Sequence, residues 1–573
     1  MRKIYPYIKP FTGYILLTLL IKIFASAADL LIPYFMEIIL SVGAQSGNVS
    51  VIYIYGGLMA LCAIIGLTMN VLANRMSAVS AGKITQTIRH DLFKKTLHLS
   101  ARQMDSLTVS SAESRLTSDT YNINQILARV QRIGIRAPIL LVGGIAMMLM
   151  IDTGLALIPI ALLPIIALIT YFVTKHSIPL YTKQQTILDR VVRTVQENIT
   201  GVRVIKALSK TDHEKARFNA VNSELNDVGE LAGTVTAITM PATSLILNIG
   251  LTIVVLLGAI RVKGGSTEPS VIVAFLQYFT MILNAMVGVT RIFVMWSKAE
   301  ASARRVADVL EKPEDQVVLD AIETDENPAA IEFRNVTFSY TGRGTNIANL
   351  NFRLEKGQTL GILGATGSGK STIINLLLRL YDVDKGQILI GGQDIRTIAP
   401  EVLTKKFGVV FQNDFIAEGD IAHNIRFFRD IPDEKLMKAA KHAQAERILA
   451  EKEAGLSSAV AIRGNNLSGG QKQRLLIARA LAGDPEILIL DDASSALDYQ
   501  TDAQLRKALR ENYRDTTTVL IAQRVSSLRH ADLILVISDG QVIGSGKHSE
   551  LIENCEEYRI IAQTQMGAEE VQV

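Results

Sequence analysis

This chain of 573 residues has few cysteines and little net charge, and its N-terminus does not resemble a leader peptide. Its two cysteines, Cys62 and Cys555, cannot form a disulfide framework, so the soluble part is expected in a reducing compartment. A formal net charge of +4 is small for this length and gives no support for a nucleic-acid partner. The N-terminus lacks a short apolar core followed by small residues, and we expect no removable signal peptide.

Long apolar runs are plentiful. Hydrophobic residues make up 49% of the chain and charged residues 20%, which indicates a membrane part joined to a water-soluble part. A membrane-spanning helix needs about 20 mostly apolar residues. Six runs meet this requirement, near 13–42, 51–75, 137–153, 155–175, 237–260 and 270–295. Only residues 151–154 separate the third run from the fourth, which predicts a tight helical hairpin.

Two polar stretches, at about 76–136 and 176–235, are rich in Lys and Arg, whereas the loops near 44–50 and 152–154 have neither. Positive charge accumulates on the cytoplasmic side of membranes, so both stretches and both termini are expected in the cytoplasm. Apolar residues recur in them at helical spacing, and Gly and Pro are few. They are therefore predicted to be long helical hairpins that extend the spans into the cytoplasm.

A phosphate-binding pattern follows later in the chain. The run at 358–363 leads into a segment that fits G-x-x-x-x-G-K-[ST], and an apolar helix follows it. Glycines there let backbone N–H groups approach phosphate oxygens, and the helix N-terminus favours negative charge. Lys370 is expected at the β- and γ-phosphates of ATP, and the Ser371 hydroxyl at Mg²⁺. The expected ATP-binding residues here are Gly364, Ala365, Thr366, Gly367, Ser368, Gly369, Lys370, Ser371 and Thr372.

A second buried strand is predicted at 487–490, and Asp491 at its tip is expected to bind the metal. Residues 311–330 are acidic and lack apolar periodicity, which is typical of a linker. It would join a membrane domain at 1–310 to a nucleotide-binding domain at 331–573. The predicted fold class is an α-helical membrane domain, with six transmembrane helices and long cytoplasmic extensions, followed by an α/β P-loop nucleotide-binding domain.

Another segment lies at the start of a predicted helix and consists of Leu467, Ser468, Gly469, Gly470 and Gln471. Phosphate binding by a phosphate loop does not in general require such a segment. It matches the signature of ATP-binding cassette (ABC) proteins, and the whole chain resembles an ABC exporter half-transporter. The resemblance implies that two cassettes pair head to tail, so that each ATP lies between one phosphate loop and the other chain's signature. It also implies that Tyr340 stacks on adenine, Gln412 joins Mg²⁺ and Asp498 belongs to the D-loop.

In the membrane part, Ser114–Asp119 and Glu197–Lys206 resemble family segments in the two cytoplasmic hairpins. The resemblance implies a short coupling helix at each hairpin tip, near 117–123 and a little after 205. These tips would transmit the closing of the cassettes to the spans.

Two positions depart from the family pattern at the hydrolytic centre. The family places a glutamate after the metal-binding aspartate to polarise the attacking water, and this chain has Asp492. Its carboxylate is one methylene shorter, and a misplacement of about 1 Å can cost about 10²-fold in rate. The expected switch histidine is Gln523, whose amide donates a hydrogen bond but cannot relay a proton.

An intact ATP-binding set with an impaired hydrolytic pair predicts a site that binds ATP and rarely cleaves it. Because the complete signature serves a partner's ATP, we expect a heterodimer with a non-identical half-transporter, resembling a degenerate-site subunit of a bacterial multidrug exporter. The expected location is the plasma membrane. Alternatives are a homodimer with slow turnover, a lipid or peptide exporter of the same architecture, and a regulatory subunit that does not transport.

Cargo contacts are expected on the faces of the spans. The sixth span offers soft, aromatic and polar side chains that suit amphipathic compounds, although each could instead pack between helices: Phe275, Gln277, Tyr278, Phe279, Met281, Asn284, Met286 and Arg291. Lys22 and Asp29, about two helical turns apart in the first span, are costly in lipid. They are expected either to line a cavity or to form an internal pair.

Overall fold

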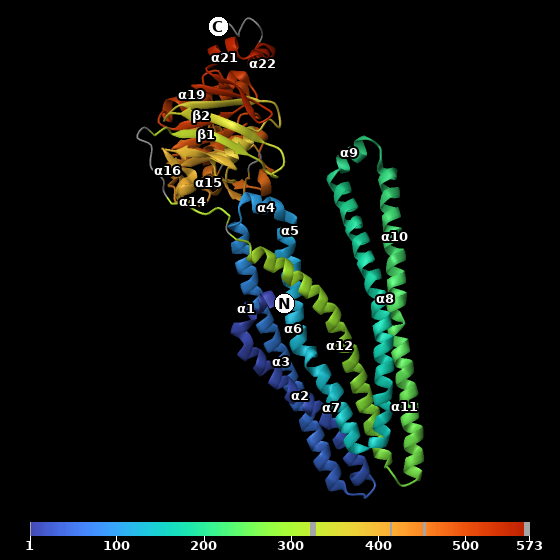
Figure 1. Cartoon of the computed structure of the whole chain (residues 1–573). Coiled ribbons are helices and arrows are strands. Elements are labelled where there is room, and N and C mark those ends of the chain that lie inside the picture. The colour runs from blue at the N-terminus through green and yellow to red at the C-terminus, as the bar shows by residue number, and fades with distance from the viewer. Residues whose placement is uncertain (1, 314, 321–327, 413–414, 451–453, 567–573) are drawn as a thin grey trace. The chain divides into compact units, whose positions relative to one another are not determined.

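The computed structural model describes residues 2–313, 315–320, 328–412, 415–450 and 454–566 (Figure 1). The chain divides into two compact units, one made of residues 1–97 with 109–312 and the other of residues 98–108 with 313–573. Residues 314 and 321–327 of the expected linker lie outside the described residues.

The first unit is helical, and six of its segments are long and apolar enough to cross a membrane. The prediction of six spans is therefore confirmed. The helices are α1 (Tyr5–Ile8), α2 (Thr12–Ile38), α3 (Val49–Leu97), α5 (Val109–Ser114), α6 (Thr120–Arg129), α7 (Arg136–Ile151), α8 (Thr153–Thr200), α9 (Val202–Ala207), α10 (Thr211–Ala237), α11 (Thr239–Lys263) and α12 (Pro269–Leu310). Asp152 separates α7 from α8, and its carboxylate caps α8 by accepting hydrogen bonds from the N–H groups of Gly154 and Leu155.

Long helices continue past the length that a bilayer requires. The 48 residues of α8 span about 70 Å at 1.5 Å per residue, against about 30 Å of hydrocarbon. α8 and α10 run side by side with α9 at their tip (Figure 1). The charged residues of the hairpin are thus carried beyond the apolar part of the same helices.

The short helix of the first hairpin does not lie where the family resemblance placed it. Residues 115–129 form continuous helical turns, so the expectation of a coupling helix near 117–123 is wrong. The short helix is α4 (Ala101–Leu107), which belongs to the second unit. The Ser100 hydroxyl caps its start by accepting from the N–H of Gln103 at 3.2 Å, and Thr108 ends it with a left-handed φ of 61°. These local signals lie before the family-like segment.

The second unit is an α/β fold, as predicted. A six-stranded sheet has the order β12-β11-β3-β10-β9-β6, and only the β12–β11 pair is antiparallel. Its strands are β3 (Thr359–Gly364), β6 (Phe407–Val410), β9 (Ile487–Asp491), β10 (Thr517–Ile521), β11 (Leu533–Ser538) and β12 (Gln541–Gly546). An antiparallel sheet of order β2-β1-β4-β5 contains β1 (Ile331–Phe338), β2 (Ile347–Leu354), β4 (Lys385–Ile390) and β5 (Gln393–Asp394).

The helices of this unit follow from the parallel strands, because parallel neighbours require crossover connections. Those that position the site are α13 (Lys370–Leu377), α18 (Gly469–Leu481), α19 (Tyr499–Asn512), α20 (Val525–Leu528) and α22 (Glu556–Met566). The remaining ones are α14 (Pro400–Lys405), α15 (Ile421–Arg426), α16 (Asp433–His442), α17 (Glu446–Ala450) and α21 (His548–Asn554), and a short β7 (Gly419–Asp420) pairs with β8 (Ala459–Val460).

Candidate functional site

Four neighbouring parallel strands, β3, β10, β9 and β6, end at one edge of the six-stranded sheet. Ile521 at the end of β10 is in register with Ile362 of β3 and Asp491 of β9. Segments that are far apart in sequence therefore meet at this edge, where open α/β sheets bind their ligands. A cavity of about 420 Å³ lies there, lined by Tyr340, Thr345, Asn346, Thr366, Gly367, Gly369, Lys370, Ser371, Thr372, Gln412, Asp491, Asp492, Ile521, Gln523, Asp539 and Gly540.

Most of the expected ATP-binding residues line this cavity, whereas Gly364, Ala365 and Ser368 of the phosphate loop do not. Gly364 is required by close packing, because a Cβ atom there would lie 2.2 Å from the Ile537 carbonyl oxygen. Gly369 adopts a φ of 108°, which a residue with a side chain rarely reaches, and it directly precedes α13. The loop is thereby bent so that the first N–H groups of α13 face the cavity edge.

The cationic and metal-binding positions are close together. Lys370 Nζ donates hydrogen bonds to the carbonyl oxygens of Gly364 and Ala365, at 2.9 and 2.7 Å. Ser371 Oγ donates to Asp491 Oδ2 at 3.0 Å. Burial raises the pKa of Asp491 and the neighbouring Asp492 carboxylate adds to this rise.

These groups fit Mg²⁺. A hydroxyl and a buried carboxylate converge within hydrogen-bond distance, and Gln412 lines the same cavity. Magnesium prefers such hard oxygen ligands and usually keeps water and substrate phosphate oxygens in its remaining positions. A bound cation would also relieve the electrostatic cost of burying the Asp491 carboxylate. When bound, Mg²⁺ would supply charge neutralisation between the β- and γ-phosphates.

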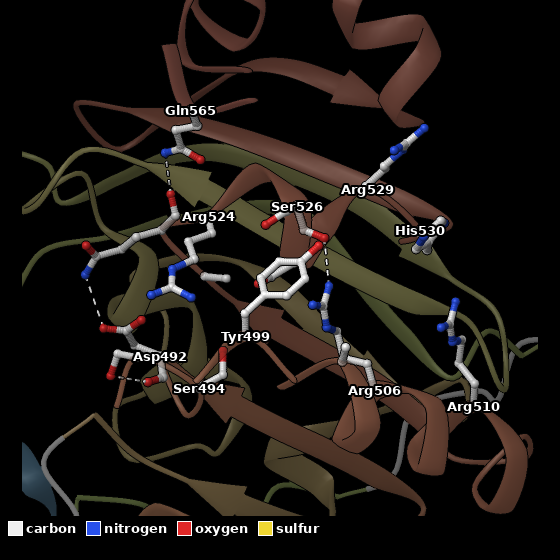
Figure 2. A pocket seen from close by; sticks show the side chains of 15 residues that line it. Asp492, Ser494, Tyr499, Arg506, Arg510, Arg524, Ser526, Arg529, His530 and Gln565 are labelled. Carbon is white, nitrogen blue, oxygen red and sulfur yellow. Dashed lines mark hydrogen bonds between the residues drawn. The ribbon is translucent and has the colours of Figure 1, made fainter. Parts of the chain in front are cut away.

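The two residues that depart from the family pattern are hydrogen-bonded to each other (Figure 2). Gln523 Nε2 donates to Asp492 Oδ2 at 3.1 Å. The backbone oxygen of Gln523 in turn accepts a hydrogen bond from Gln565 Nε2 of α22 at 2.8 Å. Burial raises the pKa of Asp492, and the bond from Gln523 opposes that rise. The carboxylate and the amide that would act on a nucleotide are therefore engaged with each other.

Tyr340 is anchored between aromatic rings and α13. Its ring meets those of Phe338 and Tyr381 edge-on, both at 4.9 Å between centroids. Its hydroxyl donates to Thr372 Oγ1 at 3.3 Å and accepts from Asn375 Nδ2 at 3.1 Å. The ring expected to stack on adenine is thus held directly beside the phosphate loop.

The aromatic chain continues from Tyr340 to α4. Tyr381, whose ring contacts Tyr340, donates a hydrogen bond from its hydroxyl to Asp105 Oδ2 of α4 at 2.5 Å. Arg102 of the same helix lies over the Phe338 ring at 5.8 Å and pairs with Asp384 at 3.6 Å. The short helix thereby contacts residues one layer away from the nucleotide cavity.

Sequence reasoning missed Asn346 and Gly540, which line the cavity beside the phosphate loop. Asn346 Oδ1 accepts a hydrogen bond from the Tyr340 N–H at 3.0 Å and so fixes the loop that carries the aromatic ring. A Cβ atom at Gly540 would lie 2.4 Å from the Asn346 carbonyl oxygen. The only sequence signal was the Asp539-Gly540 turn, which has no local link to phosphate binding.

The signature segment forms the start of α18. Ser468 is the cap residue, and its hydroxyl accepts from the Gln471 N–H at 3.3 Å while Gln471 Oε1 accepts from the Ser468 N–H at 2.9 Å. Leu467 is buried behind the cap. A Cβ atom at Gly470 would lie 3.0 Å from the Ala496 carbonyl oxygen, so the signature lies close against the D-loop.

Leu467–Gln471 are absent from the described lining of the phosphate-loop cavity. Gln473 of α18 connects the signature to the D-loop, since its amide donates to Ser495 Oγ at 3.0 Å and accepts from the Ala496 N–H at 2.9 Å. Asp498 caps α19 by accepting from the N–H and hydroxyl of Thr501, both at 2.8 Å. The signature therefore lies apart from the described lining of the phosphate-loop cavity of the same chain.

A second and larger cavity, about 1200 Å³, adjoins Asp492 and Gln523 on the side of α19 and α20 (Figure 2). Its lining is basic, with Arg506, Arg510 and Arg524 among the labelled side chains. Arg506 donates to the Ser526 carbonyl oxygen at 2.7 Å and pairs with Asp502, which fixes its position. Asp492 and Gln523 therefore line both the phosphate-loop cavity and this basic cavity.

Six of the eight sixth-span candidates divide into two groups. Phe275, Tyr278 and Phe279 are fully buried, and Tyr278 donates a hydrogen bond to the Leu30 carbonyl oxygen at 2.8 Å. These aromatic residues pack the helical core. Gln277, Met281 and Asn284 instead line a cavity in the first unit. The side chain of Arg291 lies outside the described residues.

Comparisons with known proteins agree along the whole chain. Residues 15–286 match the family model described as ABC transporter transmembrane region, and residues 347–495 match the model described as ABC transporter. YfiB of Bacillus subtilis, an ABC transporter ATP-binding protein, is 32% identical over 99% of this chain and 99% of its own length. A Mycobacterium tuberculosis protein named fatty acid ABC transporter ATP-binding/permease protein is 32% identical over 83% of this chain and 76% of its own length. The solved structure of a bacterial Atm1-family ABC exporter with ATP bound has the same fold, with a TM-score of 0.81 at 23% identity. The match covers 97% of this chain and 98% of that chain.

Proposed function

The chain belongs to the ABC transporter family, and from this premise we propose that it is one half of a heterodimeric exporter of amphipathic small molecules. The family assignment makes it an ATPase-coupled, multi-pass membrane protein, and exporters of this kind work as dimers. The basic hairpins support a cytoplasmic nucleotide-binding domain, and the relatives named above support a bacterial plasma membrane.

The observation that carries the proposal is the hydrogen bond from Gln523 to Asp492. In the proposed site, Lys370 and the phosphate loop bind the phosphates of ATP, and Ser371, Asp491 and Gln412 hold Mg²⁺. Asp492 is too short to polarise the attacking water well, and its Oδ2 is already occupied by the Gln523 amide. This site would therefore bind ATP and hydrolyse it slowly.

The intact signature gives the proposal its second half. Ser468 and the N–H groups that start α18 favour a γ-phosphate at this helix N-terminus. Because this chain's own nucleotide cavity is not lined by the signature, the signature would complete the partner's site. A partner with a competent glutamate and histidine would perform most of the hydrolysis.

The same architecture also suits a lipid exporter, and one relative is named for fatty acids. That name favours an amphipathic cargo with a long apolar part over a peptide. A homodimer would contain two copies of the impaired pair. A purely regulatory subunit would have no need of six spans.

Two measurements on purified protein test the proposal. The chain alone should bind a fluorescent ATP analogue but hydrolyse ATP slowly, whereas the complex with the half-transporter encoded beside it should hydrolyse ATP at least about 10-fold faster. The neighbouring gene is expected to encode Glu after its metal-binding Asp, His at the switch position and an altered signature. Ordinary exporter rates of ATPase and transport by the chain alone would refute the heterodimer.

A further inference from the structure

A cavity of about 720 Å³ lies among the helices of the first unit, and its lining combines residues of the apolar spans with residues of the adjoining polar stretch. It is lined by residues of α2, α3, α6, α7 and α12 and by the π-helical turn Val130–Gly134. Its charged lining consists of Lys22, Asp29, Arg129, Arg132 and Arg136. Four cations and one carboxylate therefore face one cavity, which has an excess of positive charge.

Only one of the four cations has a carboxylate partner among the described residues. Arg136 Nη2 donates to Asp29 Oδ2 at 2.9 Å. Lys22 is 2% exposed, and its Nζ donates to the amide oxygens of Asn70 and Asn74, at 2.7 and 3.2 Å. Neutral amides satisfy the hydrogen bonds of an ammonium group but leave its charge uncompensated.

The arginines have unused donors. The Nε atoms of Arg132 and Arg136 are buried and have no hydrogen-bond partner in the part of the chain that the structure describes. Among the described residues, the acceptor that Arg129 reaches is a thioether, Met295 Sδ, at 3.2 Å, and a thioether is a weak acceptor. The π-helical turn holds Arg132 between Arg129 of α6 and Arg136 of α7, and such turns are frequent at functional sites.

The rest of the lining is apolar or weakly polar. Leu140 and Met281 come from α7 and α12, and Ile32 comes from α2. Gln277 and Asn284 add two amides. A ligand with a negatively charged head and an apolar body matches both parts of this surface.

We propose that the cargo is an anionic amphiphile whose carboxylate or phosphate head binds Lys22, Arg132 and Arg136 and whose apolar part lies along Leu140 and Met281. This substrate class rests on the proposed export function. A bound oxyanion would accept hydrogen bonds from the arginine side chains and compensate the excess of positive charge. The head could belong to a free fatty acid or to an anionic phospholipid.

Binding is measured on the full-length chain in nanodiscs of neutral phosphatidylcholine, by equilibrium dialysis of three single-chain probes: oleate, oleyl alcohol and oleylamine. Oleate should bind at least about 10-fold more tightly than oleyl alcohol, and oleylamine more weakly than both. Competition with phosphatidylglycerol distinguishes the sources: displacement of oleate assigns a site that also accepts phospholipid heads, and its failure restricts the site to single-chain anions.

Arg132→Gln should weaken oleate binding about 10-fold, equivalent to about 1.4 kcal/mol, and leave oleyl alcohol binding unchanged. Arg132→Lys keeps the charge and should preserve the preference for oleate, which covers the case in which the neutral variant folds poorly. Arg193→Gln, at an exposed position of α8, is the matched control and should change nothing.

Equal binding of oleate and oleyl alcohol by the native chain would overturn the inference, and so would an oleate affinity insensitive to Arg132→Gln. The ATPase rate of the complex is recorded in parallel. A loss of anion preference with intact ATP-driven export of a neutral amphiphile rejects only the substrate class. Absence of ATP-driven export altogether rejects the proposed function itself.

Discussion

The hydrogen-bonded pair of Asp492 and Gln523 allows the proposed slow hydrolysis at this site to be tested by substitution. Asp492→Glu lengthens the side chain by one methylene, and Gln523→His replaces the amide donor with an imidazole. The double variant should raise the ATPase rate of the isolated chain about 100-fold, because a displacement of about 1 Å at a reacting group costs about that factor. The two intact signatures of a homodimer could then each complete a repaired site.

Each single variant should give a smaller increase in ATPase rate than the double variant. Asp492→Glu alone should raise the ATPase rate about 10-fold, because the remaining Gln523 amide still holds the carboxylate in a hydrogen bond. A hydrogen bond to a charged group is worth about 1.5–3 kcal/mol. A double-mutant cycle measures this coupling directly. Asp492 has a left-handed φ of 52°, which aspartate tolerates better than glutamate, so the melting temperature should fall slightly.

The assay is phosphate release by the purified chain, with ATP affinity and dimer content measured on the same sample. Asp430→Glu, the same change at an exposed position, controls for the added methylene. If the double variant binds ATP and dimerises like the native chain but hydrolyses it no faster, the assigned cause of the slow site is wrong.

Four other outcomes are expected. Lys370→Ala should weaken ATP binding by the isolated chain about 10- to 100-fold, since it removes a charge-assisted contact, as a fluorescent nucleotide titration can show. Ser468→Ala should leave the ATP affinity of the isolated chain unchanged but reduce the ATPase rate of the complex several-fold, because the signature acts on the partner's ATP. A several-fold loss of ATP affinity in the isolated chain would contradict this. Tyr381→Phe removes the hydrogen bond to Asp105 and should speed amide hydrogen exchange in α4 about 5-fold, equivalent to about 1 kcal/mol, without altering ATP affinity. Burial lowers the pKa of His548 below 6.5, so the stability that neutral His548 contributes is present above that pH and is lost as the pH falls through the lowered pKa. The melting temperature of His548→Gln should therefore depend less on pH between about 7 and 5 than that of the native chain. An unchanged pH dependence would contradict the assignment.

Local sequence patterns predicted the elements that depend on local physics. The apolar runs predicted six spans because their length must match the bilayer, and residues 364–371 predicted a phosphate loop because glycine and a helix start suffice to form one. The failure at 117–123 has the opposite cause. Family likeness at Ser114–Asp119 indicated a hairpin tip, whereas the cap at Ser100 and the break at Thr108 place the short helix earlier.

The aromatic residues of the sixth span also show what local sequence patterns cannot predict. Phe275 and Tyr278 have the composition of a cargo surface, but their burial is decided by which side of α12 faces the neighbouring helices. Asn346 and Gly540 enter the nucleotide cavity only because β2 and the β11–β12 turn lie beside the phosphate loop.

Taken alone, the order of residues determined the membrane spans, the α/β domain, the phosphate loop and the two altered positions, since each is written in a short stretch of chain. Only the tertiary structure joined Asp492 to Gln523, placed α4 beside Tyr381 and gathered Lys22, Arg132 and Arg136 around one cavity. Those contacts link residues on different strands or helices, and distances of that kind are set by packing and strand register rather than by local preference.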